Sequence, residues 1–246
     1  MYGYGKTNIG IVRKNNEDSI FLSNDKIGDL PNLYIVADGM GGHSAGEVAS
    51  INSIKYFLTY LRRNSLVEDD YLDFLISAVN YSNLKVLGKS LKNKAYEGMG
   101  TTFTACTIIE NKLYIIHIGD SRLYLIRDGE IDQLTSDHSY VWELVKSGKI
   151  TNKEAKKHRD RNVVLTALGT EETILVDGIV KNIKDNDIIL ICSDGLSDMV
   201  FDEDILKIIN ESDFESALDK LIEVSNINGG YDNISAILVS GEVAFN

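Results

Sequence analysis

The pattern of hydrophobic and polar positions changes along the chain, and each change marks the end of a predicted element. Leu33 to Ala37 is a run of five apolar or aromatic residues that predicts a buried strand ending at Asp38-Gly39. From Val48 to Leu61 the apolar residues keep helical spacing as far as the basic pair Arg62-Arg63, which predicts an amphipathic helix. Ser44 to Glu47 has the pattern of a capping box before it. Asp38 is therefore expected at the C-terminal end of a buried strand.

Most of the remaining chain is divided into short strands and helices. Loose alternation predicts strands at Gly3 to Val12 and Ser19 to Ser23, and a second amphipathic helix runs from Asp69 to Leu87 with Gly88 as its stop. An antiparallel meander is expected over 101–109, 113–118, 122–127 and 130–134, further strands over 174–180, 187–192 and 234–239, and helices over 202–209 and 214–226.

The order of these elements predicts an α+β fold in four layers, α-β-β-α, with two packed, mainly antiparallel sheets flanked by helices. The absence of a Pro-rich or Gly/Ser-rich linker favours one domain over residues 1–246. Two short polar helices between Ser139 and Arg161, the second with a capping box at Thr151 to Glu154, form an excursion from the sheets at about 136–170.

The charge of the chain excludes several classes of partner. A formal net charge of −12 argues against nucleic-acid binding, which needs a basic surface, and equally against a membrane surface. The N-terminus lacks the pattern of a signal peptide, and no apolar run approaches the roughly 20 residues that span a bilayer, so we expect a cytoplasmic protein. Cys106 and Cys192 stand in apolar runs and are expected to be buried, reduced thiols.

Four Asp-Gly pairs occur, and such pairs also form tight turns. Asp128-Gly129 lies between two strand-like segments and Asp177-Gly178 interrupts a strand, so both are interpreted as structural. Asp38-Gly39 and Asp194-Gly195 each end an apolar strand and lead into polar or helical sequence, which favours a functional role.

Asp18 and Asp232 occur in comparable settings, and we expect them to converge with Asp194 on Asp38. Carboxylates held close together repel one another unless a cation or a shared proton offsets their charge. Oxygen ligation without His or Cys clusters favours Mg²⁺ or Mn²⁺ over Zn²⁺, and the Gly39 carbonyl can add a ligand because no Cβ crowds it. The residues thus predict a carboxylate metal centre that hydrolyses phosphate esters.

Six segments of the chain, in this order, match motifs of a known family: 10–18 (Gly-Ile-Val-Arg-Lys-Asn-Asn-Glu-Asp), 36–43 (Val-Ala-Asp-Gly-Met-Gly-Gly-His), 98–102 (Gly-Met-Gly-Thr-Thr), 118–122 (Ile-Gly-Asp-Ser-Arg), 192–196 (Cys-Ser-Asp-Gly-Leu) and 229–235 (Gly-Gly-Tyr-Asp-Asn-Ile-Ser). With these motifs the chain resembles the metal-dependent protein serine/threonine phosphatases of the PP2C type, in their compact bacterial form. The resemblance spans nearly the whole chain.

The resemblance implies a role for each matched residue. Asp38 would bridge two Mn²⁺ or Mg²⁺ ions, with Asp194 and Asp232 completing one ion and the Gly39 carbonyl joining the other. Asp18 would stand in the outer shell and hold metal-bound water.

Three further assignments follow from the same motifs. Asp120 matches a position that binds a third ion together with Asp194, although its turn could also be a simple hairpin. Arg13 matches the residue that binds the substrate phosphate, for which a planar guanidinium is better suited than an ammonium group. Asn233 would be an outer-sphere partner.

The proton donor for the leaving group does not follow from the motifs. Eukaryotic relatives have a His directly after the Asp-Gly pair, where this chain has Met40, so the nearest histidine, His43, is the candidate, with helix-start packing as the alternative. His138 is an outside candidate for a role in the flap, and His117 and His158 are interpreted as structural.

Residues 134–170 resemble the flap of the bacterial enzymes. Two departures are an Arg at 159 in place of the expected Pro and no Arg between Thr166 and Ala167.

The resemblance implies hydrolysis of phosphoserine and phosphothreonine in proteins by a metal-bridged water. The enzyme would be a monomer and would oppose a bacterial Ser/Thr kinase. The alternatives are a phosphatase-like module that binds phosphorylated partners and a hydrolase of small phosphate esters.

Overall fold

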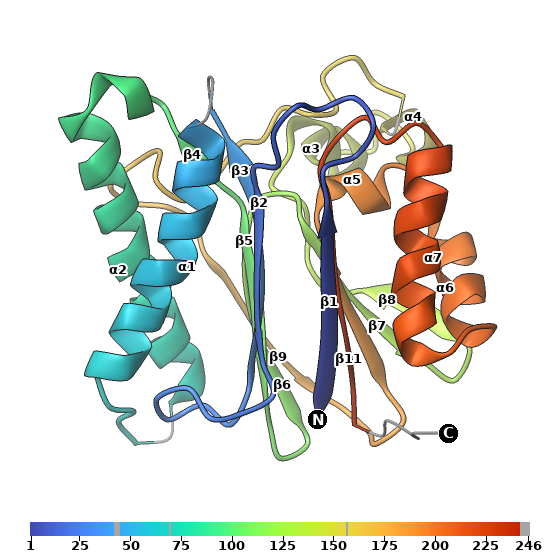
Figure 1. Ribbon diagram of the computed structural model, residues 1–246, viewed down its shortest axis with the longest axis horizontal. Coiled ribbons are helices and arrows are strands. Elements are labelled where there is room, and N and C mark those ends of the chain that lie inside the picture. Colours follow the sequence, from blue (N-terminus) through green and yellow to red (C-terminus); the bar gives the residue numbers. More distant parts are fainter. Residues whose placement is uncertain (42–44, 69, 156, 242–246) are drawn as a thin grey trace.

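The strands of the protein form two antiparallel sheets (Figure 1). The computed structural model describes residues 1–41, 45–68, 70–155 and 157–241. In spatial order, the first sheet contains β1 (Tyr2–Asn8), β11 (Ile234–Ser240), β10 (Ile188–Cys192), β7 (Arg122–Arg127) and β8 (Glu130–Gln133). The second contains β2 (Asp18–Ser23), β3 (Leu33–Met40), β5 (Phe103–Ile109), β6 (Lys112–Ile118) and β9 (Asp177–Asn182), and β4 (Gly100–Thr101) pairs with the end of β3.

Helices cover the outer face of each sheet (Figure 1). The long helices α1 (Ala45–Arg63) and α2 (Tyr71–Lys92) pack on the second sheet, and α6 (Asp202–Asn210) and α7 (Phe214–Ile227) pack on the first. A 3₁₀ turn, η1 (Lys94–Tyr96), follows α2, and the short helix α5 (Asp194–Ser197) follows β10. The predicted α-β-β-α arrangement is therefore confirmed. In the described part of the chain, no helix is both long and apolar enough to cross a membrane.

The alternation along β3 explains the layers. Leu33 and Ile35 belong to the hydrophobic core between the second sheet and α1 and α2. Tyr34 and Val36, on the opposite face of the same strand, belong to the core between the two sheets. A third core joins the first sheet to α6 and α7. A strand that is buried on both faces reads as a continuous apolar run, which is the pattern that ends at Asp38.

Two predicted boundaries are wrong by at least four residues. The first strand ends at Asn8 rather than Val12, because residues 11 and 12 leave the sheet and donate their backbone N–H groups to Gly230 O at 2.8 and 3.2 Å. Helix α2 continues through Gly88 to Lys92, because the apolar face of the helix packs on α1 and β6 and outweighs the roughly 1 kcal/mol that a helical glycine costs. The capping box predicted at Ser44 to Glu47 includes residues outside those described.

The predicted meander is also divided between the two sheets. β5 and β6 pair in the second sheet, whereas β7 and β8 pair in the first, so the turn at 119–121 crosses from one sheet to the other. Hydrophobic periodicity identifies the strands but cannot distinguish a hairpin from a crossing of this length. The crossing places Asp120 at the junction of the two sheets.

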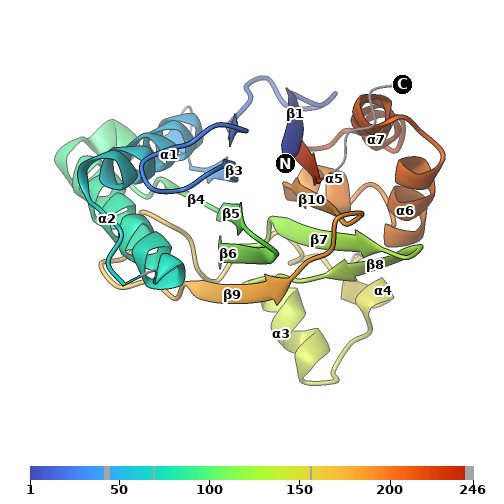
Figure 2. The ribbon, with the colours of Figure 1, turned by 90° about the horizontal axis from the view of Figure 1, so that it is seen from below.

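The excursion contains α3 (Tyr140–Lys146) and α4 (Asn152–Ala155), which Figure 2 shows outside the four layers. The predicted capping box is confirmed, because Glu154 Oε2 accepts the Thr151 N–H at 2.7 Å and Thr151 Oγ1 accepts the Glu154 N–H at 3.3 Å. An isolated bridge between Ser139 and Val164 joins the two arms of the excursion, and one between Thr101 and Leu168 returns its C-terminal end to β4.

Candidate metal centre

The pairing of β2 with β3 brings the first two predicted carboxylates together. Asp18 and Asp38 are direct cross-strand partners in the antiparallel register, so their side chains share one face of the sheet. Two threonines fix the backbone at Asp38. Thr102 Oγ1 accepts the Asp38 N–H at 2.9 Å, and Thr101 Oγ1 donates to the Asp38 carbonyl at 2.8 Å.

Asp194 and Asp232 reach the same place from the C-terminal third of the chain. A Cβ added at Gly195 would lie 2.0 Å from Asn233 O, so the absence of a side chain at 195 allows the start of α5 to touch the loop before β11. Ser193 Oγ donates to Asp18 Oδ2 at 2.8 Å, which links the loop before Asp194 to β2. The N-terminal and C-terminal carboxylates are thereby held in one cluster.

Two adjoining hollows are both lined by residues of this cluster. A cleft of about 440 Å³ is lined by Asp38, Asp120, Asp194 and Asp232 together with Arg13. A smaller cavity of about 110 Å³ lies beside it and is lined on one side by Asp120 and Asp194. Four of the five predicted acidic residues therefore line one cleft, and Asp18 lies beneath it as the buried partner of Asp38.

Burial and mutual repulsion raise the pKa values of these carboxyl groups. The pKa of Asp38 lies well above its usual range, first because the group is buried and then because Asp18, Asp194, Asp120 and Asp232 repel its charge. Burial likewise raises the pKa of Asp18 to about 6, and burial with repulsion from Asp137 raises that of Asp120 to about 7. Such a cluster is stable as carboxylates only with a compensating cation.

Unpartnered oxygens in the cluster fit a hard divalent ion. Asp18 Oδ1, Asp194 Oδ1 and Glu17 Oε1 are buried and accept no hydrogen bond from the protein. Among the described residues, no three His, Cys, Asp or Glu side chains form a ready cage for an ion. An open, all-oxygen donor set suits Mg²⁺ or Mn²⁺, which keep several waters, better than Zn²⁺, which prefers closed N and S ligation.

Arg13 lies at the edge of the cleft with about half of its side chain exposed. Its Nη2 donates to Asp232 Oδ2 at 2.6 Å. The guanidinium is therefore held beside the carboxylates while part of its donor set faces the cleft, as binding of a phosphate requires.

Asn233 is buried, and its amide is engaged with the segment that carries Arg13 and Asp18. Its Oδ1 accepts the Glu17 N–H at 2.8 Å, and its Nδ2 donates to the carbonyls of Ile9 and Asn15 at 2.9 Å each. The amide thus fixes the loop between β1 and β2. Its predicted outer-sphere role toward an ion stays a prediction.

The four histidines differ in position. His43, the predicted proton donor, lies outside the described residues. His117 is fully buried, and burial lowers its pKa to about 4, as expected for a structural residue. His158 is a partly exposed residue of the excursion near Asp160. His138 is buried beside the turn that carries Asp120, a contact that the sequence did not predict.

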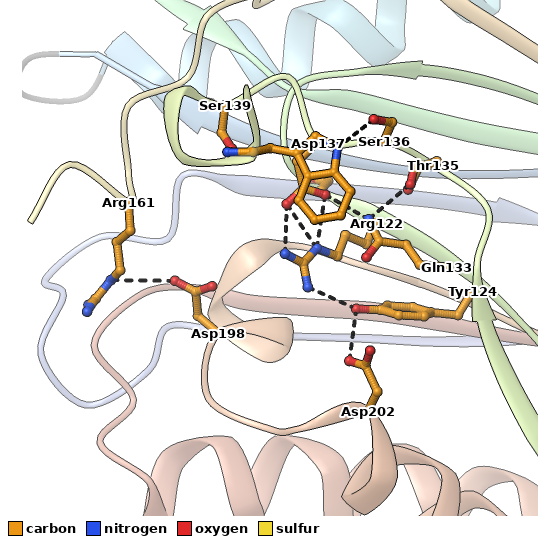
Figure 3. Close-up of polar contacts among 12 residues, drawn as sticks. Arg122, Tyr124, Gln133, Thr135, Ser136, Asp137, Ser139, Arg161, Asp198 and Asp202 are labelled. Atoms are coloured by element: carbon orange, nitrogen blue, oxygen red, sulfur yellow. Dashed lines mark hydrogen bonds and ion pairs between the residues drawn. The ribbon is translucent and has the colours of Figure 1, made fainter. Parts of the chain in front are cut away.

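Two acidic residues near the cluster were missed by the sequence analysis. Glu17 lines the cleft, and burial raises its pKa. Asp198 lines the smaller cavity, and its charge contributes to the raised pKa values of Asp120 and Asp194. Figure 3 shows Arg161 of the excursion reaching Asp198, at 3.6 Å. The spacing of four residues between Asp194 and Asp198, one helical turn, was the available signal.

Comparison with known proteins identifies the family. The sequence profile of protein phosphatase 2C matches residues 11–238. The serine/threonine phosphatase stp of Listeria welshimeri is 35% identical, with 97% of this chain and 95% of that protein covered. PstP of Mycobacterium tuberculosis, a serine/threonine protein phosphatase, is 39% identical over 93% of this chain, which spans 43% of PstP.

A solved structure agrees in fold. The catalytic domain of PstP in complex with two manganese ions superposes with a TM-score of 0.84 at 36% identity, covering 96% of both chains. The two-sheet architecture, the order of the motifs and these similarities lead to one family. The chain belongs to the protein phosphatase 2C family, and the serine/threonine phosphatase predicted from its motifs is confirmed.

Proposed function

We propose that this phosphatase hydrolyses phosphoserine and phosphothreonine esters of proteins at the cleft around Asp38, with Mn²⁺ or Mg²⁺ as cofactor. The observation that carries the proposal is the cluster of buried and partly buried, mutually repelling carboxylates beside Arg13. The manganese complex of PstP, similar in fold, supports a two-ion centre of the same kind.

Each residue of the cluster has a proposed role in holding the ions. Two ions would be held by Asp38, Asp194, Asp232 and the Gly39 carbonyl, and a third by Asp120 with Asp194. Divalent ions in such a site lower the pKa of water and offset the negative charge of the phosphate. The carboxylate of Asp18, which accepts a hydrogen bond from Ser193, would orient water from the outer shell.

The remaining residues bind the substrate and transfer a proton. Arg13 would bind two phosphate oxygens through its planar guanidinium. Asn233 keeps Arg13 and Asp18 in place by fixing the loop between β1 and β2. His43 remains the proposed donor of the proton to the leaving alkoxide, and a phenolate leaving group, which needs no such proton, would bypass it.

The proposed substrates are phosphorylated proteins, including a Ser/Thr kinase that this enzyme would oppose. The net charge of −12 makes a nucleic-acid substrate implausible. The single domain over 1–246, the monomeric state, the cytoplasmic location and the absence of a membrane partner stay predictions.

The proposal is tested with p-nitrophenyl phosphate and a phosphothreonine peptide as substrates. We expect turnover of both with added Mn²⁺, none with excess EDTA, and a loss of at least about 10³-fold in kcat for Asp38→Asn, because the central carboxylate of the ion site is removed. Asp128→Asn, in the exposed hairpin turn, is the matched control and should behave as the wild type.

Turnover that persists in EDTA would overturn the metal-dependent mechanism. Hydrolysis of small esters with a kcat/KM for phosphopeptides at least 100-fold lower would instead favour a small-ester hydrolase. Mn²⁺ binding without any turnover would favour the binding module.

A further inference from the structure

The turn that carries Asp120 depends on close contacts at Gly119. Gly119 has φ +103, a conformation that L side chains rarely adopt, and a Cβ there would lie 2.6 Å from Thr102 Cγ2. Asp120 follows directly and lines both hollows of the cluster. Its position therefore depends on what holds the Gly119 peptide groups.

His138, from the start of the excursion, holds both polar groups of Gly119. The backbone N–H of His138 donates to Gly119 O at 2.7 Å. The backbone N–H of Gly119 donates to His138 Nδ1 at 3.3 Å. The main chain and the side chain of His138 thus both form hydrogen bonds with Gly119. Only the bond from the Gly119 N–H to Nδ1 depends on the imidazole.

The tautomer of His138 follows from these contacts. Nδ1 can accept the Gly119 N–H only when it carries no hydrogen, so in the neutral ring the hydrogen is on Nε2. Nε2 lies 3.1 Å from Asp177 Oδ2, which accepts that hydrogen. Asp177, the first residue of β9, is thereby a functional neighbour of the Asp120 turn rather than only a strand irregularity.

The imidazole has little freedom to move. The side chain of His138 is 8% exposed, and its ring lies 4.9 Å from the ring of His117, centroid to centroid. His117 is itself held by Thr104 Oγ1 at 2.9 Å from its Nδ1. The preceding residue, Asp137, accepts from Arg122 Nη2 at 2.7 Å and from Nε at 3.0 Å (Figure 3).

Asp137 and His138 therefore contact both flanks of the Asp120 turn, at Arg122 and at Gly119. We propose that His138 is a positioning residue, whose Nδ1 holds the Gly119-Asp120 turn in the conformation that binds the third divalent ion, and that Asp177 fixes the tautomer this requires. The inference rests on the proposed role of Asp120 in a third ion site. The start of the excursion and that site would then form one unit.

Two amide substitutions each keep one of the two hydrogen bonds of the imidazole and remove the other. In His138→Asn, Oδ1 stands near the place of Nδ1 and can accept the Gly119 N–H, whereas Asp177 is out of reach. In His138→Gln, the longer amide reaches toward Asp177 and leaves the Gly119 N–H without its acceptor. His158→Asn is the matched control, since His158 lies in the excursion but contacts Asp160.

Calorimetric titration with Mn²⁺ measures binding without turnover. We expect the weakest Mn²⁺ binding event to be lost in Asp120→Ala, weakened at least tenfold in His138→Gln, and kept within about threefold in His138→Asn and His158→Asn. The stronger events should change less than threefold in the His138 variants. Thermal unfolding in EDTA verifies that each variant is folded.

Kinetics supply a second readout. For His138→Gln we expect the Mn²⁺ concentration for half-maximal turnover to rise at least tenfold, with KM for p-nitrophenyl phosphate unchanged at saturating Mn²⁺. Equal Mn²⁺ affinity in His138→Gln and His138→Asn would overturn the role of Nδ1. If Asp120→Ala keeps every binding event, the third-site assignment fails, and the inference fails with it, while the two-ion phosphatase stands.

Discussion

At the scale of single residues, the cleft combines fixed backbone with unfavourable charge. The peptide groups of Asp38 are held by the hydroxyls of Thr101 and Thr102, so the end of β3 that carries the carboxylate is fixed beside its neighbours. The pKa of Asp38 is raised because the charge is buried and repelled where it stands. Arg13 is the one cation of the chain that both lines the cleft and contacts a carboxylate of the cluster, within the described residues.

Replacing Arg13 by Lys keeps the charge and removes the planar pair of donors. We expect Arg13→Lys to raise KM for p-nitrophenyl phosphate about tenfold and to lower kcat by less, because two oriented hydrogen bonds to the phosphate become one. Steady-state kinetics at saturating Mn²⁺ measure both constants. Arg159→Lys, on an exposed part of the excursion, is the control. A tenfold loss confined to kcat would contradict a role in ground-state phosphate binding.

At the scale of elements, the site is built where loops from different elements touch. The start of α5 meets the loop before β11 at Gly195, and the loop after β1 meets the loop after α7 at Gly230. Both contacts bring backbone within reach of backbone, which requires a residue without a Cβ. Gly88 shows the opposite case, because it lies within α2, four residues before the helix ends, and no atom lies within 4 Å of an added Cβ apart from its chain neighbours and the helix backbone.

The two glycines therefore predict opposite effects on stability. Gly195→Ala should lower the free energy of unfolding by roughly 1–3 kcal/mol, because its Cβ would overlap Asn233 O, 2.0 Å away. Gly88→Ala should raise it by about 0.5–1 kcal/mol, since alanine has the higher helix propensity and room is available. Urea unfolding in EDTA measures both changes. A destabilising Gly88→Ala would show that the α2 backbone needs glycine there.

At the scale of the whole molecule, the fold brings negative charge together. The chain carries a net charge of −12, and β2, β3, the turn at 119–121, α5 and the loop before β11 each bring a carboxylate to one end of the sheets. Protonation or cation binding must offset this charge. Stability of the metal-free protein is therefore linked to pH.

The sign of this linkage follows from the raised pKa values. Asp18 and Asp120 have pKa values of about 6 and about 7 when folded, against about 3.9 for an unfolded Asp, so between about pH 4 and pH 7 the folded state binds more protons. Their contribution to stability is present at low pH and is lost as pH rises through that window. We expect the Tm in EDTA to fall from pH 5 to pH 8.

Added Mn²⁺ should raise the Tm more at pH 8 than at pH 5, because ions bind the deprotonated carboxylates. Asp120→Asn, which carries a neutral amide, should show a shallower fall in EDTA. Differential scanning calorimetry measures these midpoints. A Tm in EDTA that rises between pH 5 and pH 8 would contradict the account of the cluster.

Much of the fold and most of the site were predictable from the sequence. Apolar runs and helical spacing identify strands and helices, since a strand buried on both faces and a helix packed on one have different periods. The motifs around Asp18, Asp38, Asp120, Asp194 and Asp232 identify the carboxylates, because local sequence sets which turn follows which strand. The same local signals failed at Gly88 and Val12, where packing on other elements decides the boundary.

Tertiary structure alone decided which turns cross between sheets and which distant residues meet. Periodicity gives the faces of a strand but not the sheet to which it belongs, so the crossing at 119–121 appeared only in the fold. The assignments for His138 and Asp177 rest on contacts between residues at least 19 positions apart. That for Asp198 rests on its charge near Asp194, one helical turn away. Such contacts depend on how layers pack, and no short stretch of sequence encodes them. The sequence by itself identified the carboxylates of the candidate metal centre, because they stand in short motifs, and the packing of two sheets determined what holds them in place.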